Sequence, residues 1–536
     1  MMTTLKLTLL LDSALGEALD EGAIREAAQA SAQALCTRLG LPATPTLTVE
    51  RAALSHGLAA LQVEDSLCRH ADSLESALFA AGRGTLYAPS SREMIAAWLR
   101  EQPERMPPFF SAFVQHVLSA QADRLLSEPV LAAYRDLLPE TLSTYSLSAL
   151  HKVLAPLLAS RLSLQNVKAI AEALEESADE RAEALFAQLR PQRLAITCST
   201  ATLRALTESA REDERELFSL MRDGLFHELG IRLPSLTFAV DDSLPFNQFS
   251  LTLNDLPSVA WQGLSAEQVL VNASAEQVRE RGIPAQPAHN VANGRQVALA
   301  HSADADAIRA EGFYVWTPFG HLVLNVSALL RQHSALFMCQ EMARSMLDQV
   351  GLAFPALAEA IQARITLPAL ARLLRALLAE GVGVRNMRLI LEAILAYDYI
   401  LMPSGYLAFD ERLQVSAPPN LEAGLVAFVR TRLCRQLTHQ AAREGTPIPV
   451  HLLSPELEAA VLEAPEQAQA RLLGALRAHI AKASESAPIL LTTNDIRATV
   501  RALIGVELPQ VRVLAYQELV PEVAVQPIAR LTLDES

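Results

Sequence analysis

Few side chains in this sequence have the types and spacing that chemistry requires. The densest polar cluster is His301, Asp304 and Asp306, in which an imidazole and two carboxylates offer metal ligands. Ligands that lie close together in sequence usually show i, i+4 or CxxC spacing, and this cluster shows neither. We therefore interpret Asp304 and Asp306 as acids in the first turn of a helix, where the helix dipole favours negative charge.

Two further patterns are weaker still. Cys68 and His70 lie two residues apart without a second pair, so they do not predict a zinc site. Gly381 and Gly383 flank a helix start but lack the Lys-Ser or Lys-Thr pair of a phosphate loop. A GxSxG elbow, an HExxH helix and a GxGxxG turn after a strand are also missing. The sequence therefore predicts no enzyme, no bound metal and no cofactor.

Composition excludes several kinds of partner and location. The 45 basic and 60 acidic residues give a net charge of −15 without a basic block, which argues against nucleic-acid binding. The five widely spaced cysteines fit no disulfide framework and suggest a reducing compartment. The apolar run that starts at Met1 is broken by Asp12, and the best membrane candidate, Leu367 to Leu395, carries six charges. We expect a cytoplasmic protein with neither a signal peptide nor a membrane span.

The elements that would position any site are mostly helices. Of the 536 residues, 51% are hydrophobic and only 5% aromatic, and Leu and Ala dominate, which favours helices packed through aliphatic stripes. Single cores stop growing well below this length, so we expect several domains. The predicted fold class is α+β, helix-rich and multidomain.

An internal duplication organises the chain. Ser146 to Leu174 aligns without gaps with Thr366 to Ile394 at an offset of 220, and the shared apolar positions have helical spacing. We therefore predict a helical hairpin in both segments. The identical residues, by their first-copy numbers, are Leu147, Ala149, Leu150, Leu154, Leu157, Leu158, Ala159, Asn166, Ile170, Glu172 and Ala173.

The duplication extends upstream. Leu39-Gly40 and the strand-like run after it parallel Leu229-Gly230 and its following run at an offset of 190, while Leu5 to Leu9 parallels Leu194 to Cys198. Both copies thus read strand, helix, Leu-Gly turn, strand. Because the offset grows from 190 to 220, the second copy holds about thirty extra residues. We expect them between Val240 and Ala300.

The C-terminal tail has no upstream counterpart. Pro488 to Leu491 and Val511 to Tyr516 read as buried strands, and Asn494 to Ile504 reads as the helix between them. The preceding stretch, Ser454 to Ser484, has helical spacing. We therefore expect two related units, each a small α/β subdomain plus a helical subdomain, followed by a C-terminal βαβ-containing domain.

Several segments of the second copy and the tail resemble one known family. The run from Glu380 to Ala393, EGVGVRNMRLILEA, looks like the signature of the cytoplasmic part of the FHIPEP family, the export-gate proteins of flagellar and injectisome type III secretion. Leu229-Gly230-Ile231 followed by Pro234 resembles its ELGxxxP segment, and Gln340-Glu341 with Leu347-Asp348 resembles its QE…LLD helix. The tail resembles its closing βαβ region.

The resemblance implies a domain order and a biological setting. It gives a degenerate first copy of the export-gate module over residues 1–190, α/β subdomains over 191–336, a helical subdomain over 337–440 and a terminal α/β subdomain over 441–536. In the family such a module forms a ring beneath the membrane and receives substrates and chaperones. The family's membrane half, with its transport motif, has no counterpart here, so we expect this chain not to be the gate by itself.

The resemblance also points to a binding cleft. Flagellar members line a chaperone cleft with an Asp and a Phe in an Asp-Pro-Ala-Phe segment and with a downstream Thr. The matching positions here are Gln286, His289 and Leu324. Replacement of the carboxylate, the ring and the hydroxyl would alter both the apolar anchor and the polar contacts of that cleft. We therefore expect a specificity that differs from the flagellar one.

A second candidate site lies in the signature run. Arg385, Asn386, Arg388 and Glu392 are predicted to share the polar face of one helix. They form either a subunit interface or a solvated face on which Arg388 and Glu392 pair at i, i+4. Lys168 and Glu172 keep this pairing in the first copy, and both interpretations stand.

The sequence therefore predicts a non-enzymatic component of a type III protein-export apparatus. It would act in the cytoplasm, peripheral at the apparatus, and bind substrates, chaperones or gate subunits in a virulence system. One alternative is a soluble regulator that competes with the gate ring, and another is a hydrolase or metalloenzyme. Because a tethered first copy can occupy the face that would otherwise extend a ring, we expect monomers or small oligomers.

Overall fold

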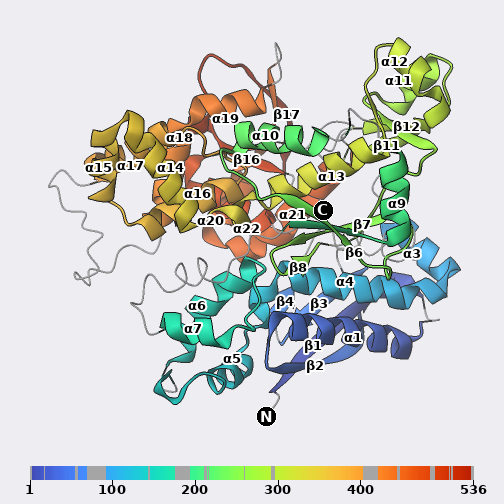
Figure 1. Cartoon of the computed structure of the whole chain (residues 1–536), viewed down its shortest axis with the longest axis horizontal. Helices are drawn as coiled ribbons and strands as arrows, with labels where there is room; N and C mark the ends of the chain where they lie inside the picture. Colours follow the sequence, from blue (N-terminus) through green and yellow to red (C-terminus); the bar gives the residue numbers. More distant parts are fainter. Residues whose placement is uncertain are drawn as a thin grey trace. The chain divides into compact units, whose positions relative to one another are not determined.

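A computed structural model describes most of the chain (Figure 1). The described residues are 3–16, 19–54, 58–64, 66–68, 92–142, 145–174, 194–209, 214, 216–258, 260–290, 296–401, 421–442, 447–482, 489–505, 508 and 511–532. They divide into two compact units. Unit 1 contains Met1–Leu217, Pro234–Asn290 and Gln296–Val326, and unit 2 contains Phe218–Leu233 and Ser327–Ser536.

The first sheet belongs to unit 1 and has the order β2-β1-β3-β4. Its strands are β1 (Thr3–Asp12), β2 (Ala43–Ala52), β3 (Ala59–Val63) and β4 (Ser66–Cys68). Helix α1 (Glu21–Leu39) joins the parallel strands β1 and β2 and packs against β2 and against α4 (Met106–Ala120). Every second residue of β1 from Leu5 to Leu11 is a fully buried leucine, so the alternation predicted the buried face.

A second sheet in unit 1 repeats this topology. Its order is β6-β5-β7-β8, with β9 also paired to β7. The strands are β5 (Leu194–Cys198), β6 (Leu236–Val240), β7 (Gln248–Leu253), β8 (Leu256–Pro257) and β9 (Trp261–Gln262). As in the first sheet, the first two strands are parallel and the third is antiparallel to the first. Helices α9 (Thr200–Ser209) and α10 (Leu217–Leu229) connect β5 to β6, so the predicted order of strand, helix, Leu-Gly turn and strand is confirmed.

The strand register corrects one detail of the alignment. Leu7 pairs with Leu47 and Val63 in the first sheet, and Leu194 holds the same position in the second sheet, opposite Leu236 and Leu253. Leu7 is therefore the counterpart of Leu194, whereas the sequence alignment matched Leu5 to Leu194. A slip of two residues keeps every side chain on the same face of a strand, so the sequence pattern could not detect it.

The aligned segments both form helical hairpins, as predicted. In the first copy they are α6 (Leu147–Ala159) and α7 (Val167–Leu174), and in the second α16 (Leu367–Ala379) and α17 (Met387–Leu401) (Figure 1). The first helix of each pair is capped alike, because Ser146 Oγ accepts from Ala149 N and Thr366 Oγ1 accepts from Ala369 N. The first copy also contains α3 (Arg92–Glu101) and α5 (Glu128–Arg135). The second copy also contains α13 (Pro318–Gln332), α14 (Gln340–Ala353), α15 (Pro355–Gln362), α18 (Leu421–Arg432) and α19 (Cys434–Ala441).

The extra residues of the second copy form a small antiparallel sheet of order β11-β12-β10-β13. Its elements are β10 (Gln268–Val271), α11 (Ala275–Glu280), β11 (Ala285–His289), β12 (Gln296–His301), α12 (Ala305–Ala310) and β13 (Val315–Trp316). They continue past the predicted interval, which ended at Ala300. The described residues of the first copy hold no counterpart of this sheet.

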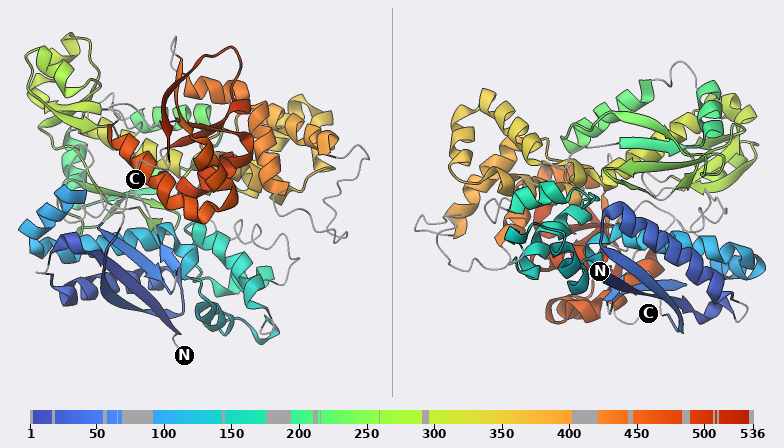
Figure 2. Two further views of the ribbon diagram at one scale, coloured as in Figure 1. Left: turned by 180° about the vertical axis from the view of Figure 1, so that it is seen from behind. Right: turned by 60° about the horizontal axis from the view of Figure 1, so that its bottom comes forward.

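The C-terminal part of unit 2 is a three-layered α/β domain with an all-parallel sheet of order β16-β15-β14-β17. The strands are β14 (Ile448–Leu453), β15 (Ile489–Thr492), β16 (Arg512–Ala515) and β17 (Val525–Leu531). Helices α20 (Pro455–Glu463), α21 (Pro465–Lys482) and α22 (Asn494–Ile504) pack on one face and α19 on the other (Figure 2). The predicted βαβ unit is present as β15, α22 and β16.

In the described part of the chain, no helix has the length and apolar character that crossing a bilayer demands.

Candidate functional site

The signature run of the second copy holds the end of helix α10 in place. Gly230 ends α10 with a left-handed φ of 79° and lies against the backbone of Arg385. Val384 N donates a 2.8 Å hydrogen bond to Leu229 O, and Arg385 Nη1 donates to His227 O at 3.5 Å. The α16–α17 loop therefore satisfies carbonyl groups that the helix end leaves without a partner.

The first copy makes the same contact with its own residues. Gly40 ends α1 with a φ of 71°, and Leu164 N donates a 2.8 Å hydrogen bond to Leu39 O. Gln165 Nε2 donates to Thr37 O at 3.0 Å, in the role that Arg385 has in the second copy. The residue numbers of the two helix ends differ by 190, and those of the two loops differ by 220. The two offsets found in the sequence therefore belong to the two sides of one contact that both copies make.

This contact corrects the prediction for Arg385 and Asn386. Neither residue lies within α17, which begins at Met387, and Ile390 N donates to Asn386 O at the helix start. Both side chains are exposed, and that of Arg385 contacts the end of α10. The predicted four-residue polar face is therefore reduced to Arg388 and Glu392.

Arg388 and Glu392 form the predicted i, i+4 ion pair, with 2.8 Å between Nε and Oε1. The Arg388 guanidinium also lies 4.9 Å from the ring centroid of the exposed Phe354. The first copy keeps the pair as Lys168 and Glu172 at 3.8 Å. Both pairs are mostly exposed, so each contributes only a few tenths of a kcal/mol.

The predicted cleft residues come from the small antiparallel sheet and from α13. Gln286 lies in β11 opposite Leu299 of β12 and is exposed. Leu324 of α13 packs on that face of the sheet, in the cluster that contains Leu299 and Ala288. Two of the three residues thus share one face. His289 is the last residue of β11 and pairs through its backbone with Gln296.

Within unit 1, a turn of the second copy docks on the α6–α7 loop of the first. Asn254, which has a left-handed φ of 56°, is buried and donates from Nδ2 to Ser160 O at 3.0 Å. Asp255 N donates to Arg161 O at 3.3 Å, and Asp255 Oδ2 accepts from Ser163 N at 3.0 Å. Three hydrogen bonds therefore join the β7–β8 turn to the loop. No sequence pattern predicted this contact.

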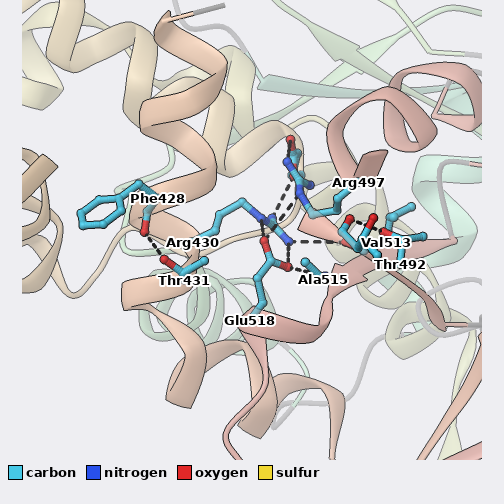
Figure 3. A network of polar contacts seen from close by, with 10 residues as sticks. Phe428, Arg430, Thr431, Thr492, Arg497, Val513, Ala515 and Glu518 are labelled. Atoms are coloured by element: carbon cyan, nitrogen blue, oxygen red, sulfur yellow. Dashed lines mark hydrogen bonds and ion pairs between the residues drawn. The ribbon is translucent and has the colours of Figure 1, made fainter. Parts of the chain in front are cut away.

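A buried ion network joins the helical part of unit 2 to its C-terminal domain (Figure 3). Arg430 of α18 reaches Glu518 through Nε at 2.6 Å and through Nη2 at 2.8 Å. Its Nη1 lies 2.9 Å from Glu380 Oε2, at the end of α16, and Arg497 of α22 also contacts Glu380. Arg430, Arg497 and Glu518 are at most 1% exposed. Ala515 N completes the network by donating to Glu518 Oε2 at 3.1 Å.

The electrostatics of this network favour the charged forms. Burial alone would raise the pKa of Glu380, but the guanidinium groups of Arg430 and Arg497 outweigh it and hold that pKa below its usual value. Two arginines thus face two glutamates; Arg430, Arg497 and Glu518 are buried, and the Glu380 side chain is 20% exposed. No local spacing pattern relates these four residues, which explains why they could not be predicted from the sequence.

The polar side chains considered as possible metal ligands interact with residues that are close to them in the sequence. His301 Nδ1 accepts from Ala303 N at 3.1 Å, and Asp306 pairs with Arg309 at 2.7 Å. Asp304 is the N-cap residue of α12 and Asp306 lies in its first turn, as predicted. Among the described residues, no three His, Cys, Asp or Glu side chains converge as metal ligands. His70 lies outside the described residues, and Cys68 is a buried free thiol like Cys36, Cys198 and Cys339.

One buried histidine has a pKa well below its ordinary value. His321 of α13 is 1% exposed, and burial lowers its pKa to about 4. Asn325 Nδ2 lies 3.1 Å from its Nε2 and donates to its main-chain carbonyl at 2.8 Å. The imidazole is therefore neutral at physiological pH and packs as part of the core.

We expect the free energy of unfolding of unit 1 to fall as the pH drops from about 6.5 to about 4. In this window the unfolded chain takes up a proton at His321 that the folded chain does not, which costs about 3 kcal/mol in total. Urea unfolding monitored by tryptophan fluorescence should show this loss. The variant His321→Gln should lack this part of the slope, and an unchanged slope would contradict the assignment.

The similarity to known proteins covers the second copy and the C-terminal tail. The protein named low calcium response locus protein D of Yersinia pestis is 24% identical over 327 residues, which cover 58% of this chain and 44% of the relative. Hypersensitivity response secretion protein HrcV of Ralstonia nicotianae is 28% identical over 332 residues, with the same coverage. The chain thus matches less than half the length of these curated relatives.

One solved structure and one family model complete the comparison. The Chlamydia pneumoniae CdsV protein has a TM-score of 0.54 and 24% identity, and the match covers 63% of this chain and 97% of that one. It shows a shared fold. The model of the FHIPEP family matches residues 176–524, which is more than half of the chain. This chain therefore belongs to the FHIPEP family, the export-gate proteins of type III secretion.

Proposed function

We propose that this protein is a non-enzymatic component of a type III protein-export apparatus that binds substrates, chaperones or gate subunits in the cytoplasm. The observation that carries the proposal is the family match across residues 176–524. A structure of the Chlamydia pneumoniae CdsV and CdsO protein complex, with a TM-score of 0.53, supports a partner from the same apparatus. His301 and Asp306 take part in local hydrogen bonds and ion pairs, so they do not support the alternative of a hydrolase or metalloenzyme.

We further propose that residues 1–190 are a diverged copy of the family module, followed by α/β subdomains over 191–336, a helical subdomain over 337–440 and a terminal domain over 441–536. The repeated sheet topology supports this division. So does the hydrogen bond between the Leu-Gly helix end and the hairpin loop, which is 2.8 Å long in both copies.

The surface around Gln286, His289 and Leu324 is the proposed site for cargo or chaperone. Leu324 offers apolar surface beside the exposed amide of Gln286 on one face of the sheet. Such a surface suits a partner with an apolar anchor next to a hydrogen-bonding group. It lacks the carboxylate of the flagellar cleft, so we expect an injectisome-type partner.

Co-purification tests the proposal. An affinity-tagged chain, expressed at its native level in its own bacterium, should recover the membrane-anchored FHIPEP-family protein of the same cell or an export chaperone. Mass spectrometry after mild crosslinking would identify them. Recovery of folded, abundant chain with neither class of protein would contradict the proposal.

The exposed pair on α17 gives a sharper test of the subunit-interface interpretation. We expect the double variant Arg388→Ala, Glu392→Ala to recover about fivefold less gate protein, which corresponds to about 1 kcal/mol at the interface. The fold should not change, because the pair is exposed. The matched control is Lys168→Ala, Glu172→Ala in the first copy. Equal recovery by both variants would show that Arg388 and Glu392 form only a solvated face.

A regulator that competes with the gate ring is the second candidate. It is favoured by the contact of the Asn254–Asp255 turn, because the first copy of the same chain already binds this turn of the second copy.

A further inference from the structure

The residue that ends helix α6 of unit 1 has an unfavourable backbone conformation. Arg161 has a left-handed φ of 59°, which glycine adopts readily and which strains a residue with a Cβ. Its backbone closes the helix as a Schellman turn: Arg161 N donates to Leu158 O at 2.9 Å, and Leu162 N donates to Leu157 O at 3.0 Å. Glycine is the usual residue at this position of such a turn.

The second copy builds the same turn with glycine. Gly381, the counterpart of Arg161 at an offset of 220, has a φ of 71°, and its N–H donates to Leu378 O at 2.9 Å. Val382 N donates to Leu377 O, also at 2.9 Å. The turn therefore does not require an arginine for its own geometry. A role for Arg161 has to come from its side chain.

The Arg161 side chain is a buried charge. The residue is only 9% exposed, and its Nη1 is fully buried without a hydrogen-bond partner. In the described part of the chain, no carboxylate forms an ion pair with this guanidinium. Burial lowers its pKa to about 10, so the group is still charged at neutral pH. A buried charge without a partner is strongly destabilising.

Other charged groups show how unusual this side chain is. Arg430 of unit 2 is also buried, and two glutamates contact its guanidinium. In unit 1 the docked β7–β8 turn brings Asp255 to the backbone of Arg161, but the Asp255 carboxylate accepts from Ser163 N at 3.0 Å. The acidic residue of the docked turn is thus used by the loop backbone and does not neutralise Arg161.

We propose that Arg161 binds a small free oxyanion, through a carboxylate or phosphate group, where the two copies meet. A guanidinium offers paired N–H donors whose geometry matches two oxygens of such a group. Only 9% of the residue is exposed, so a small molecule reaches it more easily than a folded partner surface does. Because Arg161 O accepts from Asp255 N, the bound anion also stabilises the docked turn.

Thermal unfolding of the full chain in phosphate tests the site. Millimolar potassium phosphate should raise the unfolding midpoint of wild-type unit 1 by about 3 °C relative to potassium chloride of equal ionic strength. Tryptophan fluorescence reports this unit, because all three tryptophans lie in it. The variant Arg161→Gly should fold, since the second copy closes the same turn with glycine, and should lack this response. It also corrects for the general stabilisation that phosphate gives to folded proteins.

Arg161→Gln is the matched control, because it keeps a side chain in the left-handed turn and removes only the charge. It should also lose the phosphate response. Acetate in place of phosphate identifies the ligand group: a response to both anions indicates a carboxylate ligand, and a response to phosphate alone indicates a phosphate group. Equal midpoint shifts in wild type, Arg161→Gly and Arg161→Gln would overturn the proposal, as would a wild type that responds to neither anion.

Discussion

Arg430→Ala is expected to separate the helical part of unit 2 from its C-terminal domain, at a cost of about 3–5 kcal/mol. The substitution leaves Glu518, which is fully buried, without its bidentate partner, and it removes a cation from Glu380. A buried charge without a partner is far more costly than the loss of the attraction alone. Trp98, Trp261 and Trp316 all lie in unit 1, so fluorescence does not report this event. Hydrogen exchange of the amides in α22 and β16 does.

The control for this prediction is Arg388→Ala, which removes an arginine from an exposed pair and should cost less than about 1 kcal/mol. Acid provides a second check. In the native network the pKa of Glu380 is lowered, so its contribution is complete above the ordinary carboxyl pKa and is lost as the pH falls from there through the lowered value. Without Arg430 this pH-dependent contribution should be smaller. Exchange that is equally slow in Arg430→Ala and wild type would contradict the role of the network.

Gly230→Ala should destabilise unit 2 by about 3 kcal/mol. A Cβ at this position would overlap the backbone of Arg385, and the residue has a φ of 79°, which costs an alanine about 1 kcal/mol before any clash. The two nearest neighbouring atoms, Arg385 N and Cα, belong to the main chain, so they cannot move aside as the end of a flexible side chain would. Faster hydrogen exchange in α10 and at the start of α17 would show the effect.

Gly282→Ala is the matched control, because Gly282 has a φ of 77° and open space around its Cβ. It should lose only the strain of about 1 kcal/mol. Gly40→Ala in the first copy should resemble Gly230→Ala, since its Cβ would lie 2.7 Å from Gln165 N. Equal losses at Gly282 and Gly230 would show that the helix end and the loop are not packed as described.

The sequence predicted the parts of the fold that repeat or alternate. The hairpins from Ser146 and from Thr366 were found because aliphatic residues at helical spacing recur at one offset. The strand register was missed because alternation looks identical after a shift of two residues. The small antiparallel sheet was expected only as an insertion, since its short strands lack a long periodic run.

The sites were harder to predict than the fold. Arg430 stands among Arg432 and Arg435 in a run that reads as a solvated helix, and only the tertiary structure shows that Arg430 is buried. The contact between Asp255 and Ser163 joins two copies, and each residue looks like an ordinary turn residue in its own copy. Local patterns report periodicity and caps. They do not report which distant charges or turns meet.

The burial of the ion network has a consequence for how the protein responds to salt and heat. Dissolved ions screen charges that face water, so the pair of Arg388 and Glu392 on unit 2 weakens as salt is added. Water and counterions do not reach Arg430 and Glu518, so their attraction changes little with ionic strength. The cost of dehydrating such charges also falls on warming. Moderate heating or added salt therefore loosens the surface of unit 2 before it loosens the joint between its helical part and its C-terminal domain.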